Sequence, residues 1–170
     1  TGVDETLNRK LGVSLMQIPT KGYSVTVTPK EQIKQVFPTM PLMFSDKFII
    51  ATPRKNDLRI TSKLEVGGHS ETIKQKVIDY IVNNFLHYCT PDIDFADAQV
   101  EQWCGFRPLT PNDKPLLGRD KKYNNFIYAT GLGWLGITFG PAIGKVVSDL
   151  ITKDMQNNQS EELMHFSGLM

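Results

Sequence analysis

The sequence has little of what a metal site or a disulfide framework requires. Cysteine occurs only at Cys89 and Cys104, and there are three widely separated histidines. Neither residue type stands at a metal-ligand spacing, so we expect no metal site. Two cysteines favour a reduced pair over a disulfide framework. No histidine or pair of carboxylates stands out as a general acid or base either.

The chain also lacks a strong net charge. Nineteen basic and 18 acidic side chains leave a net charge of +1 over 170 residues, with no basic run. Proteins that bind nucleic acid usually carry a concentrated positive surface, so we expect no nucleic-acid partner. A basic segment followed by an apolar run, typical of a signal peptide, is missing at the start. We expect a cytoplasmic protein, with a peripheral position on the inner face of the cell membrane as the alternative.

The pattern of apolar residues predicts strands, then a helix. Apolar and polar residues alternate over 19–28, which predicts a half-buried strand. Two β-rich runs, 47–52 and 58–65, flank a five-residue turn and predict a hairpin. Between these segments, Thr28 and Glu31 form a capping box that predicts a short helix.

A longer helix is predicted after Gly67-Gly68. Ser70 is a candidate cap, and apolar residues recur every four positions up to Tyr88. Together with the strands, this order favours an α+β fold, in which helices cover one face of an antiparallel or mixed sheet.

Residues 126–144 contain no charged side chain and resemble a membrane span in composition. Their five glycines and Pro141, however, make a poor continuous helix. The β-branched and aromatic residues at their start favour a strand. We therefore predict a strand at 126–128, a glycine-rich turn at 131–140 and a helix from about Pro141 to Ile151.

Two features of the C-terminal region could carry chemistry. The first is the glycine-rich turn at 131–140. Its glycines would let the main chain approach the flat ring of an aromatic cofactor closely, and the positive end of the next helix would stabilise negative charge on that ring. Such a turn is also a common packing device. Arg107 presents a planar fork that can hold a carboxylate through two hydrogen bonds. The alternative for Arg107 is a surface position or an ion pair with an acid such as Glu101. Its apolar neighbours favour a half-buried side chain that needs a partner.

Four motifs occur in the order found in one enzyme family. They are PTKGYS at 19–24, EVGG at 65–68, WCGFRPLTPNDKPLLGR at 103–119 and YATG at 128–131. In this order the chain resembles the C-terminal half of the FAD-dependent D-amino acid dehydrogenase and glycine oxidase (DAO) family. Nearly all of residues 1–152 takes part in the resemblance.

The resemblance implies both an activity and a site. The activity is oxidation of a D-amino acid by hydride transfer to FAD, followed by hydrolysis to a 2-oxo acid and ammonia. The chemistry relies on positioning, so no catalytic acid or base is assigned. Arg107 would bind the substrate carboxylate, with Tyr23 as a second substrate-binding candidate. The flavin would be lined by Gly131, Leu132, Gly133, Trp134, Leu135, Gly136, Ile137 and Thr138.

Two departures from the family leave substrate and electron acceptor open. Oxidase relatives commonly have a histidine where this chain has Leu132, and several have a tyrosine on the strand matched by 48–51. A quinone or a similar acceptor is therefore expected as a partner, with oxygen as the alternative. The preferred D-amino acid is not defined.

The resemblance also implies a domain organisation. Residues 1–18 and 108–155 would belong to a flavin domain, 19–107 to a substrate-binding domain, and 156–170 to a tail. The spacing G-x-G-x-x-G occurs only at 131–136, and the acidic residue expected about twenty positions later on a second strand is missing. We therefore expect the FAD-binding half to lie outside this chain, poor FAD binding by the chain alone, and self-association through uncovered apolar surface.

Two further interpretations remain open at this stage. The chain could be a non-redox module that binds carboxylates through Arg107. It could also be a structural subunit that covers a partner chain with a nucleotide-binding fold.

Overall fold

A computed structural model describes residues 2–29, 37–89, 95, 98–123 and 125–152. Contacts between Cα atoms divide the chain into two compact units. One comprises Thr1–Thr20 with Phe106–Met170, and the other comprises Lys21–Gly105. Each unit is described by itself below.

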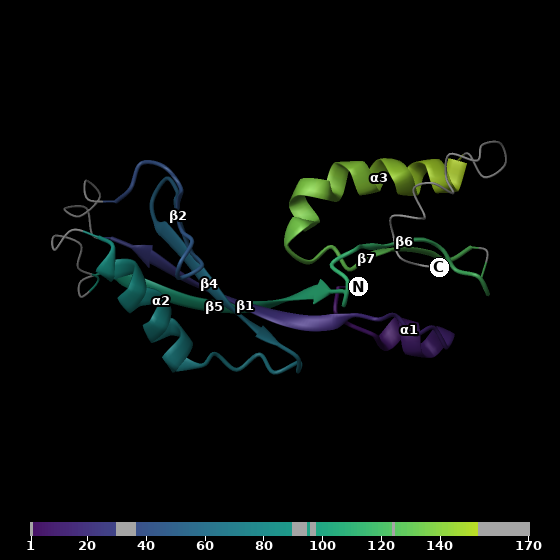
Figure 1. The fold of residues 1–170 in the computed structure, drawn as a ribbon, viewed down its shortest axis with the longest axis horizontal. Helices are drawn as coiled ribbons and strands as arrows, with labels where there is room; N and C mark the ends of the chain where they lie inside the picture. Colours follow the sequence, from purple (N-terminus) through teal and green to yellow (C-terminus); the bar gives the residue numbers. More distant parts are fainter. Residues whose placement is uncertain (1, 30–36, 90–94, 96–97, 124, 153–170) are drawn as a thin grey trace. The chain divides into compact units, whose positions relative to one another are not determined.

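The unit Lys21–Gly105 is built on a five-stranded sheet (Figure 1). Residues 18–20 of its strand β1 and 106–109 of its strand β5 belong to the other unit. In spatial order the strands are β2 (Leu42–Phe44), β3 (Ile49–Pro53), β4 (Leu58–Val66), β1 (Ile18–Thr28) and β5 (Gln99–Leu109).

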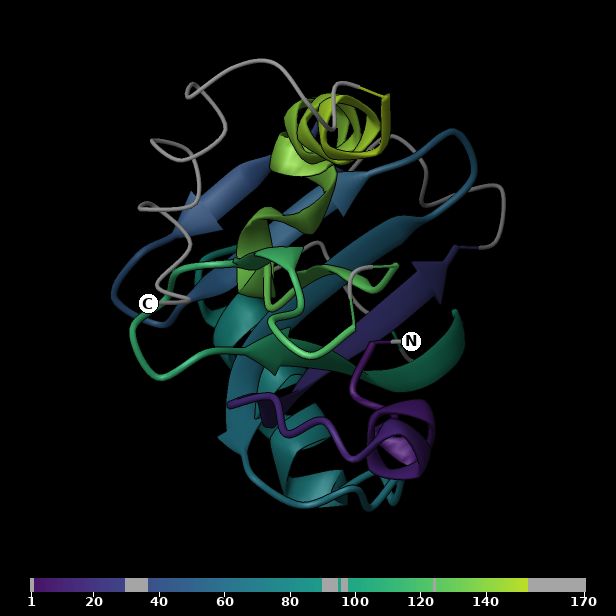
Figure 2. The same cartoon turned by 90° about the vertical axis from the view of Figure 1, so that its right-hand side faces the viewer.

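Helix α2 (Gln75–His87) packs on one face of this sheet, where it contacts β3 and β4 (Figures 1 and 2). Its apolar stripe is buried because residues four apart lie on one side of a helix. The core joins that stripe to alternate residues of the strands. Its fully buried members include Val25, Val27, Ile49, Ala51, Leu58, Ile60, Ile81 and Phe85.

The predicted hairpin is confirmed. Strands β3 and β4 pair antiparallel, with Thr52 opposite Arg59 and Pro53 opposite Leu58. The turn closes through a 2.8 Å hydrogen bond from the Arg54 N–H to the Asp57 carbonyl. Strand β2 was not predicted, since three residues next to prolines give too short a pattern to recognise.

The prediction for 19–28 is correct as a strand but not as a half-buried one. The side chains of Thr20 and Ser24 are buried although they alternate with the core residues Tyr23 and Val25, and Lys21 is buried on the same face as Tyr23. Strand β1 lies inside the sheet, between β4 and β5, so neighbouring strands flank it on both sides.

The prediction that Ser70 caps α2 is wrong. The helix begins at Gln75 with Lys74 at its N-cap and without a side-chain cap. The Ser70 hydroxyl instead accepts the Thr72 N–H at 3.3 Å. A serine can hold a local turn in this way, and the turn then competes with a helix start. The predicted capping box at Thr28 and Glu31 lies partly outside the described residues.

Among its described residues, the other unit contains α1 (Thr6–Leu11), β6 (Leu116–Arg119), β7 (Ile127–Thr130), the 3₁₀ turn η2 (Gly133–Leu135) and α3 (Gly136–Thr152). Strands β6 and β7 pair antiparallel, with Leu116 opposite Thr130 and Arg119 opposite Ile127.

The strand–turn–helix at the C-terminal end is therefore confirmed, but the helix begins five residues earlier than Pro141. Gly136, Ile137 and Thr138 are helical and do not belong to a turn. Pro141 lies inside this helix, where its fixed φ is compatible with helical backbone but its missing N–H removes one intrahelical hydrogen bond and its ring crowds the Ile137 carbonyl. Residues 133–152 are also long and apolar enough, by length and composition alone, to cross a membrane, and few of them are buried.

The assignment of residues to domains stays a prediction. It gives 19–107 a substrate-binding role and joins 1–18 with 108–155 as parts of a flavin domain. The compact units described above carry no information about which ligand each one binds.

Candidate functional site

The bend between β7 and α3 is built from two glycines in left-handed backbone conformations. Gly131 has a φ of +74° and Gly133 a φ of +51°. A Cβ atom at Gly131 would come within 2.7 Å of the Thr110 methyl group and 3.4 Å of the Leu116 nitrogen. Only glycine fits this position, because both the backbone conformation and the space exclude a side chain. The main chain therefore passes very close to the loop after β5.

That loop is itself held in place by Thr110, which is buried. Its hydroxyl donates a 2.7 Å hydrogen bond to the Lys114 carbonyl, and its own carbonyl accepts the Asp113 N–H at 3.2 Å. The Lys114 N–H donates in turn to the Asn112 side-chain oxygen at 3.2 Å. The motif at 110–114 thus forms a tight turn that fixes the methyl group against which Gly131 packs.

Arg107 lies near the end of β5, just before this loop. It is half-buried, as predicted, and its guanidinium carbon is 5.7 Å from the centroid of the Trp134 ring. Such a distance is typical of a cation–π contact. Among the described residues, no acid forms an ion pair with Arg107, so its hydrogen-bonding fork has no protein carboxylate to bind. The structure brings Arg107 and the glycine bend together.

Turn η2 and the start of α3 are apolar and exposed. Trp134 is 61% exposed and Ile137 is 95% exposed, and Leu135 and Phe139 are exposed beside them. Turn η2 runs directly into α3, and the Leu135 N–H donates to the Leu132 carbonyl at 2.9 Å. The N–H groups that precede it, at Gly133 and Trp134, lie at the positive end of the helix dipole, where a helix has no intrahelical acceptor for its first N–H groups. A cation, exposed apolar side chains and free N–H groups next to a glycine bend fit a flat ring that becomes anionic, as a reduced flavin does.

The strand that leads into the bend is anchored by polar contacts. The Thr130 hydroxyl accepts a 2.7 Å hydrogen bond from the Gln17 amide. Tyr128 donates its hydroxyl to Asp120, whose other oxygen accepts the Tyr123 N–H at 2.9 Å. Burial and the Asp120 carboxylate raise the pKa of Tyr128, while the hydroxyl it donates lowers the pKa of Asp120. Tyr128 therefore stays neutral and donates to a carboxylate over the usual pH range.

Tyr23 belongs to the unit Lys21–Gly105 and is only 2% exposed. Its side chain is part of the core, and its hydroxyl donates a 2.7 Å hydrogen bond to Glu65 Oε2. The phenol is thus already engaged by a carboxylate of the protein. A role for Tyr23 in substrate binding stays a prediction.

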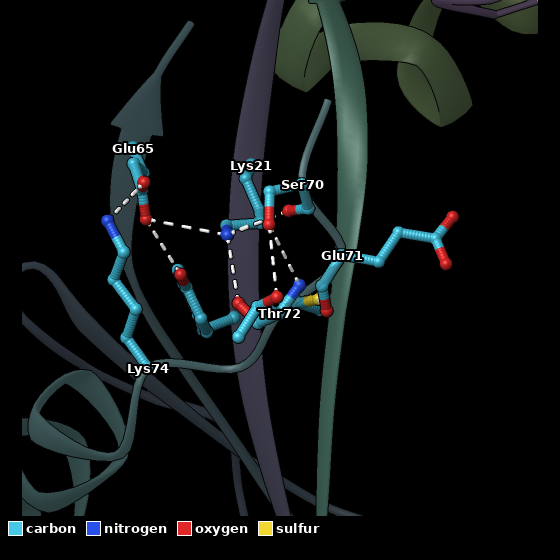
Figure 3. Close-up of polar contacts among 8 residues, drawn as sticks. Lys21, Glu65, Ser70, Glu71, Thr72 and Lys74 are labelled. Carbon is cyan, nitrogen blue, oxygen red and sulfur yellow. Dashed lines mark hydrogen bonds and ion pairs between the residues drawn. The ribbon is translucent and has the colours of Figure 1, made fainter. Parts of the chain in front are cut away.

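The same carboxylate belongs to a network centred on a buried lysine (Figure 3). Lys21 Nζ donates to the Ser70 carbonyl at 3.0 Å and to the Thr72 carbonyl at 3.1 Å, and it lies 3.6 Å from Glu65 Oε2. A buried ammonium is tolerated when each of its donors has an acceptor. Lys21 therefore fastens the segment between β4 and α2 to strand β1.

Electrostatics within this network are strong. A hydrogen bond from Lys74 at 2.5 Å and one from Tyr23 lower the pKa of Glu65 to about 2. Interaction with the Tyr23 side chain, supported by the charge of Glu65, raises the pKa of Lys21. Both groups are consequently charged across the physiological range.

Sequence reasoning did not identify Lys21 and Glu65 as a pair. One sequence signal could have found them: Lys21 stands in a predicted strand among residues expected to be buried. A buried lysine needs hydrogen-bond acceptors close to its ammonium group. Those acceptors lie about fifty positions away along the chain, at Ser70 and Thr72.

Comparison with known proteins identifies a family. The family model DAO, described as FAD dependent oxidoreductase, matches residues 1–150. A D-amino acid dehydrogenase of Helicobacter pylori is 44% identical over 167 residues, which are 98% of this chain and 39% of that protein. A D-amino acid dehydrogenase of Vibrio vulnificus (strain YJ016) is 32% identical over 89% of this chain and 35% of its own length. The chain thus spans about two fifths of the length of these relatives.

Solved structures show the same fold. Glycine oxidase from Geobacillus kaustophilus matches with a TM-score of 0.77 and 21% identity, over 100% of this chain and 44% of that one. L-proline dehydrogenase from P. horikoshii matches with a TM-score of 0.69 and 21% identity, over 91% of this chain and 41% of that one. At such identities the likeness describes the fold and leaves the substrate open.

Proposed function

Because this chain belongs to the FAD dependent oxidoreductase family, we propose that it is the C-terminal part of a flavin-dependent D-amino acid dehydrogenase. The reaction would convert a D-amino acid to an imino acid, which hydrolyses to a 2-oxo acid and ammonia. The observation that supports this proposal most is the 44% identity to a D-amino acid dehydrogenase over 98% of the chain.

Arg107 would bind the carboxylate of the amino acid. Its fork can donate two parallel N–H groups to the two carboxylate oxygens, which fixes the substrate in one orientation. The Trp134 ring beside it limits how the guanidinium can turn. Orientation of this kind accounts for catalysis without a general acid or base, because a bound amino acid with a neutral amine needs positioning rather than proton transfer.

Residues from Gly131 to Thr138 would hold the isoalloxazine ring of FAD. When bound, FAD would supply the chemistry that this chain lacks, by accepting the α-hydrogen and its electron pair from the substrate. The glycines would allow close approach of the main chain, and the N–H groups at the start of η2 would stabilise negative charge. The exposed side chains of Trp134, Leu135 and Ile137 would exclude water from one side.

The other partners follow from the same proposal. A nucleotide-binding half outside these 170 residues would carry the remainder of FAD, so residues 1–170 alone would bind it weakly. The electrons would pass on to a quinone or a similar acceptor. We place the reaction in the cytoplasm, with a peripheral position on the inner face of the cell membrane as the alternative.

The test uses the whole natural protein that carries this chain. It is mixed anaerobically with D-alanine or with L-alanine, and the visible absorbance of the flavin is followed. Bleaching by the D-enantiomer, together with formation of pyruvate and ammonia, is the expected result. A protein that purifies with FAD but is not bleached by any of a panel of D-amino acids would contradict the proposed substrate class.

A further inference from the structure

Residues 70–74, called the strap below, lie between strand β4 and helix α2 in the chain and cross three strands of the five-stranded sheet (Figure 3). On β4, Glu65 accepts a hydrogen bond from Lys74. On β1, Lys21 donates to two of the strap's carbonyls, and on β5 the Cys104 thiol donates to a third at 3.2 Å. These strands are neighbours in the order β4, β1, β5, so each of them holds one part of the strap.

The contacts from Lys21 are the strongest of the three. Its side chain is only 3% exposed, and a charged donor makes a stronger hydrogen bond than a neutral one. The side chain of Lys74 is 47% exposed, and an ion pair in contact with water adds little stability. A thiol is a weak donor, so Cys104 adds little as well. Most of what holds the strap therefore comes from one ammonium group.

The chain on either side of the strap is poorly held. Gly67 has a φ of +86° and Gly68 a φ of +78°, and a Cβ atom at either would meet nothing within 4 Å. Two unpacked glycines can change their backbone angles at little cost, as hinge residues do. At the other end, α2 begins at Gln75 without a side-chain cap. Within the strap only Ile73 packs against the core, so opening exposes little apolar surface.

We propose that the strap opens as a unit about Gly67 and Gly68, and that Lys21 is the latch that keeps it closed. Opening separates the ammonium group from both carbonyls and admits water to it, without unfolding of α2 or of the sheet. The device is independent of the proposed reaction, because every contact in it lies within the unit Lys21–Gly105. The closed strap also engages the Cys104 thiol, which supplies a means of observing the opening.

The rate of alkylation at Cys104 reports on the strap. The whole natural protein is treated with iodoacetamide, and mass spectrometry of its peptides measures the modification of each cysteine. Cys89 is the internal reference, because both thiols are free, half-buried and packed against the same core. Cys89 follows the far end of α2, about 20 Å of helix away from the strap, so a local opening does not uncover it. Loss of the whole fold would uncover both.

Lys21→Met removes the latch. Its loss should accelerate alkylation of Cys104 by about 10- to 100-fold and leave Cys89 at its wild-type rate. A more reactive thiol cannot explain such a rise, because a nearby cation favours the thiolate and its removal makes a thiol less reactive. Glu71→Gln is the matched control, since the Glu71 side chain points away from the network and its main-chain carbonyl stays in place (Figure 3). Alkylation in this variant should equal that in the wild type.

Two results would overturn the proposal. Unchanged alkylation of Cys104 in a folded Lys21→Met protein would show that Lys21 is not the latch, and equal acceleration of both cysteines would show that the unit opens as a whole. If Lys21→Met does not fold, the wild type in urea gives the answer. Cys104 should react at urea concentrations that leave Cys89 protected, with a weaker dependence on urea, because a small opening exposes little surface. A coincident urea dependence of the two cysteines would rule out a separate strap.

Discussion

The guanidinium carbon of Arg107 lies 5.7 Å from the centroid of the Trp134 ring, and this contact joins the end of β5 to the first turn after the glycine bend. An arginine that is half-buried beside an indole, without a described acid to pair with, keeps its donors for a ligand. The same contact places that ligand next to the residues proposed to line the flavin.

Replacing Arg107 tests this relationship first. In the whole protein, Arg107→Met should lower kcat/KM for a D-amino acid by about 100-fold, as expected when hydrogen bonds worth about 3 kcal/mol are lost. Steady-state kinetics give the value. Lys145→Met, which removes a cation that pairs with Asp149 on the exposed side of α3, should leave kcat/KM unchanged. Equal activity of Arg107→Met and the wild type would remove Arg107 from the site.

Gly131 offers a second test, because its conformation and its surroundings both exclude a side chain. Gly131→Ala should destabilise the protein by about 1–2 kcal/mol through the left-handed backbone alone. The 2.7 Å approach to the Thr110 methyl group adds to this loss. The midpoint of denaturant unfolding measures the change, and FAD retention after gel filtration should fall as well.

Gly144→Ala is the control for that substitution. Gly144 lies within α3, and a Cβ atom there would meet nothing within 4 Å. Alanine should stabilise the helix by about 0.5–1 kcal/mol. Equal destabilisation by both alanine variants would show that the bend does not depend on Gly131 in particular.

The pKa of Glu65 leads to a prediction about pH. Since hydrogen bonds from Lys74 and Tyr23 lower this pKa from 4.5 to about 2, the folded protein binds the Glu65 proton more weakly than the unfolded chain does. The stability from Glu65 is then fully present above its unfolded pKa and is lost as the pH falls through its folded pKa. The free energy of unfolding should be higher for the wild type than for Glu65→Gln near pH 4.5, and the difference should shrink as the pH falls toward 2. Denaturant unfolding at a series of pH values in this range measures it.

Glu71→Gln serves as the control in that experiment, because Glu71 is exposed and its side chain points away from the network (Figure 3). Its stability relative to the wild type should not vary with pH in the same window. A constant difference between Glu65→Gln and the wild type down to the lowest pH would contradict the lowered pKa.

The uncovered start of α3 predicts self-association of residues 1–170 when they are produced alone. Trp134 and Ile137 expose apolar surface that a protein in water normally covers. Light scattering should report a mass that rises with concentration, and Ile137→Glu should reduce that rise. Ser148→Glu, on an exposed polar position of the same helix, should not. A wild-type fragment that remains monomeric at high concentration would show that this surface needs no cover.

Local patterns predicted much of the fold. The alternation at 19–28, the turn at 53–57 and the four-residue spacing before Tyr88 each depend on near neighbours, and each is found in the structure. The early start of α3 was missed because its glycines and Pro141 have low helix propensity, whereas in the structure the helix continues directly from the 3₁₀ turn η2. The true start of α2 was missed for another reason, since Lys21 holds Ser70 and Thr72 from a distant strand.

The candidate site was only partly accessible from sequence. Arg107 and the glycine bend could be singled out because one residue type in each has special chemistry. The network of Lys21 and Glu65 could not, since a lysine in a strand acquires meaning only when its distant acceptors are seen beside it. Proximity between residues far apart in the chain is a tertiary property, and a single sequence does not state it.

The proline within α3 has an effect on what can dock there. A helical carbonyl normally accepts the N–H four residues later, and for Ile137 that residue is Pro141, which has none. The Ile137 carbonyl therefore lacks the usual helical donor, at the most exposed apolar position of the helix. A group that covers this surface and also presents a hydrogen-bond donor near that oxygen is matched better than a purely apolar one.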